Sequence, residues 1–359
     1  MAYSVLRRKR VLTRRMINLI LNVLFQCARH IIQMSDKEDT RHLLIIDTDC
    51  GSDDAMAIMT ALGPSGRRTH RLLAITCCFG NTTLDHVCLN VFRVLHVCQE
   101  TGVLVYRGSS APLLTDKVRP EIVHGSDGFG DCGHLFPTGE GVLEDTPAPA
   151  ALVALSKKHP SITLVVLGPL TNVALAHRLD PEFTGRLSKI VILGGNYKGV
   201  GNTTETAEFN FYCDPEAANI VLTESQCPVH IVPWETVLEY GIDWEEFEAM
   251  LAPPTPKARL LKSATAIVTE VCHKEGYCQF LDCDVLATVA ALRPDCVTTS
   301  LRRSASVECD GTLTRGMVVC RKHVPGETEV NIAVNFDESI LNNLRKEMVM
   351  ESTPEDWSV

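Results

Sequence analysis

Four carboxylates lie within one short stretch, Asp47-Thr48-Asp49-Cys50-Gly51-Ser52-Asp53-Asp54. An apolar run precedes them and a helical pattern follows, which places them between a buried strand and the first turn of a helix. Capping of that helix would explain one aspartate, Asp53, but not all four. Carboxylates packed this closely repel one another, and a divalent cation is the usual partner that stabilises them. Oxygen ligands without paired histidines or cysteines favour Ca²⁺ over zinc.

Further polar side chains recur downstream, at points where other apolar runs end. Gly80-Asn81 follows the second run, and Gly168-Pro169-Leu170-Thr171-Asn172 follows a later one. Asp284 directly precedes a helical pattern. Asparagine and glutamate at this density suit a ligand with several hydroxyl groups, such as a sugar. The other members of the set are Asn202, Glu208 and Asn210.

Short apolar runs alternate with amphipathic stretches from residue 43 onward. Near-continuous apolar strands separated by helices predict a parallel sheet covered on both faces. We therefore expect an α/β fold: a single domain with an open, mostly parallel, doubly wound (Rossmann-like) sheet and its active site at the C-terminal ends of the strands. The expected strands are 43–47, 72–77, 103–106, 162–167, 189–193 and 229–232, and the expected helices are 53–62, 83–99, 148–157, 170–178 and 214–223.

Two aspartates spaced like Asp47 and Asp49 after a first strand also occur in haloacid-dehalogenase phosphatases and in some glycosyltransferases. Those phosphatases place Thr or Val two residues after the second aspartate, where this chain has Gly51. Their motif also ends within the first loop, whereas here matching segments continue downstream.

In this order, the motifs resemble those of the inosine-uridine nucleoside hydrolase family over about residues 43–340. The resemblance implies calcium-dependent hydrolysis of the N-glycosidic bond of a ribonucleoside. Asp49 would bind the metal and deprotonate the attacking water, with Asp47 supporting it, and His124 would lie near the base on a Gly-rich lid that spans residues 124–141. The implied calcium ligands are Asp49, Asp54, the backbone carbonyl of Thr171, and Asp284. The implied ribose-binding residues are Asp53 and Asn81 for the 2′- and 3′-hydroxyls, and Asn202, Glu208 and Asn210 for the 5′- and 3′-hydroxyls.

One position departs from that family's pattern. Its best-known members place a histidine directly before the last metal-binding aspartate, as proton donor to the departing base, and here that position is Cys283. A thiol with a pKa near ~8.5 is mostly protonated at neutral pH and donates weakly. Cys283 is the candidate leaving-group acid, with Tyr277, His273 and His124 as alternatives. Two other functions stay open: a calcium- and ribose-binding protein without catalysis, and a hydrolase of a related ribosyl bond.

The net charge of −10 argues against nucleic acid as a partner, because phosphate binding needs a basic face. Residues 1–35 nevertheless carry seven Lys or Arg and no acid. We therefore expect a basic extension over residues 1–40, a catalytic domain over 41–345 and a tail over 346–359. The apolar run 16–27 is shorter than the roughly 20 residues that span a bilayer, so no stable membrane span is expected.

The fifteen cysteines include no C-x-x-C pair, and many lie inside apolar runs. We expect reduced thiols and a cytoplasmic protein. The alternative is mitochondrial, if residues 1–33 are a presequence. The expected partner is a small-molecule nucleoside, and the family resemblance implies a homodimer or homotetramer.

Overall fold

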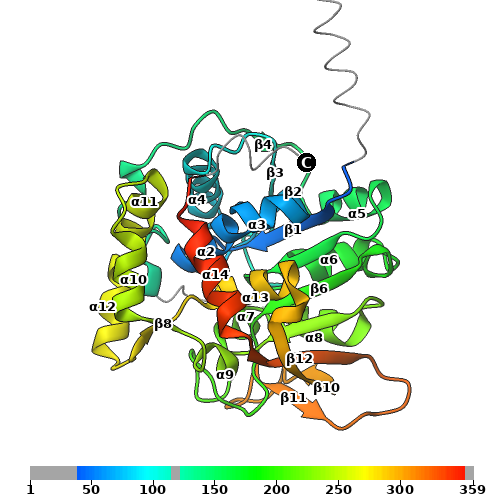
Figure 1. Ribbon diagram of the computed structural model, residues 1–359. Coiled ribbons are helices and arrows are strands. Elements are labelled where there is room, and N and C mark those ends of the chain that lie inside the picture. The colour runs from blue at the N-terminus through cyan, green and yellow to red at the C-terminus, as the bar shows by residue number, and fades with distance from the viewer. Residues whose placement is uncertain (1–38, 115–121, 352–359) are drawn as a thin grey trace, which may run out of the picture. The chain divides into compact units, whose positions relative to one another are not determined.

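The computed structural model describes residues 39–114 and 122–351. The basic extension expected over residues 1–40 lies outside this part except for its last two residues, and residues 352–359 of the expected tail also lie outside it. From His42 onward, the described residues form one α/β domain (Figure 1). No helix in this part of the chain has both the length and the apolar character needed to cross a membrane.

Ten of the described strands form one sheet in the order β11-β10-β12-β7-β6-β5-β1-β2-β3-β4. All neighbours from β12 to β4 pair in parallel, whereas β10 pairs antiparallel with β11 and β12. The predicted mostly parallel sheet is therefore confirmed. The strands are β1 (His42–Thr48), β2 (His70–Cys77), β3 (Leu104–Arg107), β4 (Leu143–Glu144), β5 (Thr163–Val166), β6 (Lys189–Leu193), β7 (Val229–Val232), β10 (Val297–Val307), β11 (Val318–Arg321) and β12 (Glu329–Phe336), with β8 (Ile242–Asp243) and β9 (Gln279–Phe280) forming a separate pair.

Helices follow most of the parallel strands, as the alternating sequence pattern predicts. The five predicted helices and six predicted strands begin and end within two residues of the observed ones. The helices are α2 (Ser52–Ala61), α3 (Pro64–Thr69), α4 (Leu84–Val97), α5 (Ala148–Lys158), α6 (Thr171–Leu179), α7 (Phe209–Cys213), α8 (Pro215–Glu224), α9 (Trp234–Val237), α10 (Trp244–Leu251), α11 (Pro256–Ala264), α12 (Ala266–Lys274), α13 (Cys283–Leu292) and α14 (Glu338–Met348).

Alternate residues of the central strands face two different layers of helices. On β1, Leu44 and Ile46 join a buried cluster with residues of α2, α4 and α13, whereas Ile45 joins a second cluster with residues of α5, α6 and α8 (Figure 1). Because both faces of the sheet are covered, these strands are apolar at nearly every position. The loops at the C-terminal ends of the strands are then free to carry polar residues.

Several observed elements have no counterpart among the predicted ones, and two regions among them are described here. Strand β10 carries Thr, Ser and Arg on a partly exposed edge of the sheet, so it lacks the apolar run used to find the other strands. Helices α10, α11 and α12 form a separate layer beside α4 (Figure 1). This second region proves important because α12 lines the site described below.

Candidate active site

The acidic loop joins β1 to α2. It leaves the sheet after Thr48, and Gly51 precedes the first turn of the helix in an extended conformation. Within the loop, Oδ2 of Asp49 accepts the backbone N–H of Asn81 over 2.7 Å. Oδ1 of Asp49 is buried and has no hydrogen-bond partner among the described residues. A buried carboxylate oxygen without a partner is costly, and a bound cation would satisfy it.

Two glycines pack against Asp49 from neighbouring strand ends. Gly80 follows β2 and Gly168 follows β5. A Cβ atom on Gly168 would stand 2.8 Å from Oδ1 of Asp49, and one on Gly80 would collide with Oδ2. Glycine at both positions therefore lets the backbone approach the carboxylate closely.

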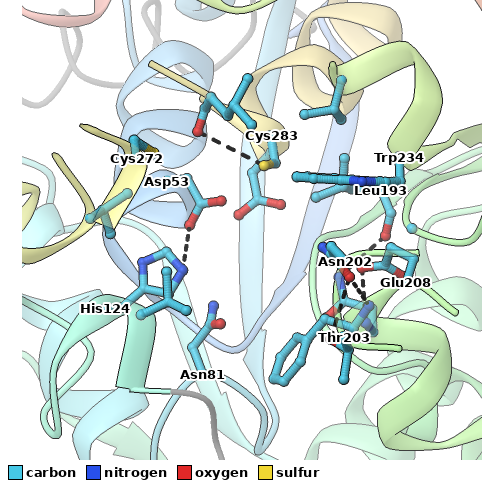
Figure 2. A pocket seen from close by; sticks show the side chains of 18 of the residues that line it. Asp53, Asn81, His124, Leu193, Asn202, Thr203, Glu208, Trp234, Cys272 and Cys283 are labelled. Atoms are coloured by element: carbon cyan, nitrogen blue, oxygen red, sulfur yellow. Dashed lines mark hydrogen bonds and ion pairs between the residues drawn. The ribbon is translucent and has the colours of Figure 1, made fainter. Parts of the chain in front are cut away.

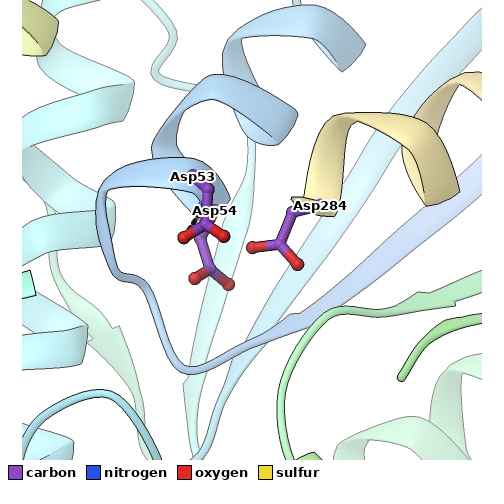
Figure 3. A group of neighbouring side chains, drawn as sticks. All are labelled: Asp53, Asp54 and Asp284. Atoms are coloured by element: carbon purple, nitrogen blue, oxygen red, sulfur yellow. Dashed lines mark hydrogen bonds between the residues drawn. The ribbon is translucent and has the colours of Figure 1, made fainter. Parts of the chain in front are cut away.

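Three further carboxylates meet at the starts of two helices. Asp53 and Asp54 lie in the first turn of α2 and Asp284 in the first turn of α13, and their oxygen atoms come within 4.8 Å of one another (Figure 3). Asp54 is held by the hydroxyl of Thr48, which donates to Oδ1 over 2.5 Å, and by the backbone N–H of Gly51, which donates to Oδ2 over 2.9 Å. The first turns of two helices thus converge on one point.

The electrostatics of this group favour a bound cation. Burial, followed by repulsion from Asp53, raises the pKa of Asp54 to about 6, and burial raises the pKa of Asp53 to about 6 as well. Burial and the neighbouring aspartates raise the pKa of Asp49 and that of Asp284 well above the ordinary range. Ionisation of all four is unfavourable unless a positive charge compensates it.

The donor set fits a hard divalent cation. Carboxylate oxygens are the ligands that Ca²⁺ prefers, and Asp49 Oδ1 has no competing partner. The structure brings Asp53, expected to bind ribose, into the same carboxylate group as Asp54 and Asp284.

Thr171 begins α6 and donates its hydroxyl to Asp214 over 2.6 Å. Its carbonyl as a calcium ligand stays a prediction.

A cavity of about 360 Å³ opens beside this group. Figure 2 shows Asp53, Asn81 and His124 on one side of it and Asn202 and Glu208 on the other. Among residues 39–114 and 122–351, no lysine or arginine lines it. The structure thus brings together, around one cavity, nine residues named from the sequence: Asp53, Asn81, His124, Asn202, Glu208, Asn210, Tyr277, Cys283 and Asp284.

Glu208 and Asn210 are fixed by backbone groups. Glu208 caps α7, accepting the backbone N–H groups of Asn210 over 2.9 Å and Phe211 over 3.2 Å, and it also accepts the N–H of Gly195 over 2.8 Å. Asn210 donates to the carbonyl of Leu167 over 2.6 Å. Burial raises the pKa of Glu208 to about 7 in spite of the three N–H donors. This side of the cavity therefore presents polar groups of fixed orientation.

His124 lies next to Asp53, on the same side of the cavity (Figure 2). Its Nδ1 accepts the backbone N–H of Ser52 over 3.3 Å, which assigns the ring proton to Nε2, and Nε2 lies 3.7 Å from Oδ1 of Asp53. Burial lowers the pKa of His124 to about 4, so the ring is neutral at pH 7. His124 thus presents a neutral N–H toward Asp53.

The segment that carries His124 is anchored to the rest of the domain. Phe129 is fully buried, and the hydroxyl of Thr82 donates to the carbonyl of Ser126 over 2.7 Å. The side-chain amide of Asn90 donates to the carbonyl of Asp127 over 2.8 Å and to that of Cys50, in the acidic loop, over 3.0 Å. These contacts hold His124 over the carboxylates.

Comparison with known proteins agrees with this geometry. The family model of the inosine-uridine preferring nucleoside hydrolases matches residues 44–343. This chain belongs to that family. The inosine-uridine preferring nucleoside hydrolase of Crithidia fasciculata is 32% identical over 307 residues, which cover 82% of this chain and 93% of the relative.

A pyrimidine-specific ribonucleoside hydrolase of Escherichia fergusonii is 33% identical over 304 residues, covering 82% of this chain and 93% of the relative. Among solved structures, an inosine-guanosine nucleoside hydrolase superposes with a TM-score of 0.79 at 28% identity, over 87% of this chain and all of that one. The chain is therefore an enzyme of the nucleoside hydrolase family, which hydrolyses N-ribosyl bonds.

In this nucleoside hydrolase, Cys283 begins α13 at the cavity wall (Figure 2). Its thiol donates to the carbonyl of Leu281 over 3.8 Å. Burial, followed by the charges of Asp53 and Asp284, raises the pKa of the thiol well above its ordinary value. The thiol is therefore protonated at neutral pH and is a weak acid.

Sequence reasoning missed an apolar wall of the nucleoside hydrolase cavity. Trp234 follows β7, so the rule that ligands bind at strand ends would have found it (Figure 2). Val268, Val271 and Cys272 come from α12, whose sequence carries no local signal of a site because tertiary packing alone brings it to the cavity.

Proposed function

We propose that this enzyme hydrolyses the N-glycosidic bond of unphosphorylated ribonucleosides, purine or pyrimidine, in a calcium-dependent reaction that releases free base and ribose. One observation carries the proposal: a buried, unpartnered oxygen of Asp49 lies beside a group of carboxylates, at a cavity lined with polar side chains. Family membership supports the reaction, and the all-oxygen donor set supports calcium.

The calcium ion would be held by Asp49, Asp54, Asp284 and the carbonyl of Thr171. When bound, the ion lowers the pKa of a water molecule and orients it. Asp49 would be the base that takes the proton of the attacking water. Its Oδ2 keeps the hydrogen bond from Asn81, which holds the carboxylate in place during the transfer.

The ribose would lie between the two polar sides of the cavity, with Asp53 and Asn81 on its 2′- and 3′-hydroxyls. Asn202, Glu208 and Asn210 would bind the 5′- and 3′-hydroxyls from the other side. Cleavage at C1′ develops positive charge on the sugar, and nearby carboxylates stabilise it. Cys283 and His124 are the proposed proton donors on the side of the base.

The charges of the cavity support a substrate without phosphate. A phosphate needs basic side chains or a cradle of backbone N–H groups, and no lysine or arginine in the described part of the chain lines this cavity. The backbone N–H groups of Gly195, Asn210 and Phe211 are already bound to Glu208. A negative Glu208 would also repel a 5′-phosphate. The apolar wall of Trp234 and α12 suits the faces of a nucleobase.

A second candidate is a calcium- and ribose-binding protein that has lost catalysis. The thiol of Cys283 favours it, because the thiol is a weak acid and its proton is already donated to the carbonyl of Leu281. The complete set of acidic and ribose-facing residues favours catalysis instead.

The test is release of free base from a panel of ribonucleosides and their 5′-phosphates, with calcium and with a chelator. The enzymes compared are the full chain, a version that starts at Met34, and Asp49→Asn. Asp85→Asn is the control, because its side chain is 75% exposed on α4. Calcium-dependent release that persists in Asp85→Asn and disappears in Asp49→Asn supports the proposal. Calcium binding without any release would support the second candidate.

We also propose a cytoplasmic homodimer or homotetramer. Every described cysteine is free, including many buried ones, which suits a reducing compartment. Light scattering of the purified chain measures the oligomeric state. Imaging of the full chain and of the version starting at Met34 separates cytoplasmic from mitochondrial localisation.

A further inference from the structure

A buried ion pair joins the last described helix to the segment that carries Cys283 and Asp284. Arg345, on α14, donates from Nη2 to Oδ1 of Asp282 over 2.5 Å and from Nε to Oδ2 over 2.8 Å. The side chains are 5% and 0% exposed, respectively. Both carboxylate oxygens of Asp282 are thus bound by one planar guanidinium, a geometry with high directional specificity.

The same guanidinium contacts a third segment. Nη2 of Arg345 also donates to the carbonyl of Tyr240 over 2.5 Å, and Nη1 donates to Asn342 on its own helix over 3.0 Å and, at 3.5 Å, to the carbonyl of Gly241. Tyr240 and Gly241 lead directly into β8 and then into α10, α11 and α12. One side chain therefore connects the segment before α13 with the start of the segment that leads to α12, which lines the cavity.

Asp282 lies next to residues of the active site. Asp282 lies between β9 and α13, immediately before Cys283 and two residues before Asp284. Asp282 itself does not line the cavity, but both residues that follow it do. Any displacement of Asp282 would shift the first turn of α13, and with it the carboxylate that meets Asp53 and Asp54.

We propose that Arg345 is a positioning residue of the active site: through Asp282 it fixes where Asp284 meets the other calcium-binding carboxylates. This inference rests on the calcium site of the proposed function. Arg345 itself does not line the cavity, so it would act through Asp282. A purely stabilising role is the alternative, yet a buried ion pair is weak evidence for stability, because desolvation offsets its attraction.

The test is calcium affinity of the full chain, measured by isothermal titration calorimetry, in Arg345→Lys. Lysine keeps the charge but loses the fork that binds both oxygens of Asp282. Arg67→Lys is the matched control. Arg67 is also largely buried, at 11% side-chain exposure, and donates to Glu100 over 2.5 Å and to the carbonyl of Leu62 over 2.8 Å, at the end of α2 remote from the carboxylates.

We expect Arg345→Lys to weaken calcium binding about tenfold or more, as loss of residues that support metal ligands typically does. Arg67→Lys should stay within about twofold of the unmodified chain while showing a similar fall in melting temperature in chelator. Equal affinities in Arg345→Lys and the unmodified chain, both folded, would overturn the proposal. Absence of calcium binding by the unmodified chain would instead overturn the proposed function.

If Arg345→Lys does not unfold cooperatively, a second variant tests the same proposal. Asn342→Ala removes one hydrogen bond to Arg345 and leaves the ion pair in place. It should weaken calcium binding several-fold, and an unchanged affinity in this folded variant would count against positioning by Arg345.

Discussion

The backbone N–H of Asn81 binds one oxygen of Asp49 over 2.7 Å, while the other oxygen is buried without a hydrogen-bond partner among the described residues. The pair fixes the direction of the carboxylate and leaves one oxygen available for a cation and a proton. Four predictions follow from this site and from the domain around it.

The first prediction concerns the space around that free oxygen. Gly168→Ala would place a methyl group 2.8 Å from Oδ1 of Asp49 and 2.9 Å from the sulfur of Cys78. We expect calcium affinity to fall about tenfold or more, and the free energy of unfolding to fall by about 1–3 kcal/mol because the site is overpacked. Gly102→Ala is the control, since its added methyl group meets only a side-chain oxygen of Glu100 at 3.4 Å. Equal losses in the two variants would contradict the prediction.

Calcium affinity should depend on pH. The pKa values of Asp53 and Asp54 are each raised to about 6, chiefly by burial, and a protonated carboxyl does not bind calcium. Affinity should therefore fall as pH drops through about 6, by roughly tenfold or more at pH 5. Calorimetric titrations at several pH values measure the calcium affinity, and a constant affinity from pH 5 to 8 would refute this pH dependence.

His70 should make the fold sensitive to acid. Burial, followed by the charge of His42, lowers the pKa of His70 to about 4 from an ordinary value of 6.5. The unfolded chain then binds a proton that the folded chain does not, so stability is full above about pH 6.5 and is lost as pH falls toward 4.

Replacing His70 with Gln should reduce that acid-dependent loss by on the order of 1 kcal/mol. Chemical denaturation at pH 7 and pH 5 measures the free energy of unfolding. His134→Gln is the control, because His134 is exposed. The same pH dependence in all three proteins would show that His70 does not contribute.

Cys283→Ala tests whether the thiol protonates the departing base. Because its pKa is raised well above the ordinary value, we expect kcat to fall by about tenfold or less. A general acid in this position would contribute about a hundredfold or more. A loss of that size, with calcium affinity unchanged, would identify the thiol as the donor and discard the weak-donor interpretation.

The sequence predicted those parts of the site that follow apolar strands. The acidic loop after β1 and Asn81 after β2 were found because each parallel strand ends at the same edge of the sheet. Asp284 was found through the order of the family's motifs. In each case a local pattern marks the residue.

The parts of the site and fold that the sequence did not predict depend on contacts between segments distant in the sequence. Arg345 and Asp282 are 63 positions apart, and neither has neighbours that indicate an ion pair. Strand β10 is polar because it lies near the edge of the sheet, so its composition resembles that of a loop. Helix α12 reaches the cavity only because α10 and α11 turn the chain back toward it.

The order of strands also determines how late in translation the sheet can be completed. The last described strand, β12, lies between β7 and β10, so among the described strands β10 joins the parallel sheet through a strand made after it. Until β12 leaves the ribosome, β7 presents an open edge that invites pairing with another nascent chain. Arg345, which follows β12, is made later still. The metal site should therefore reach its final geometry only after nearly all of the domain has been translated, and the edge of β7 stays open until then.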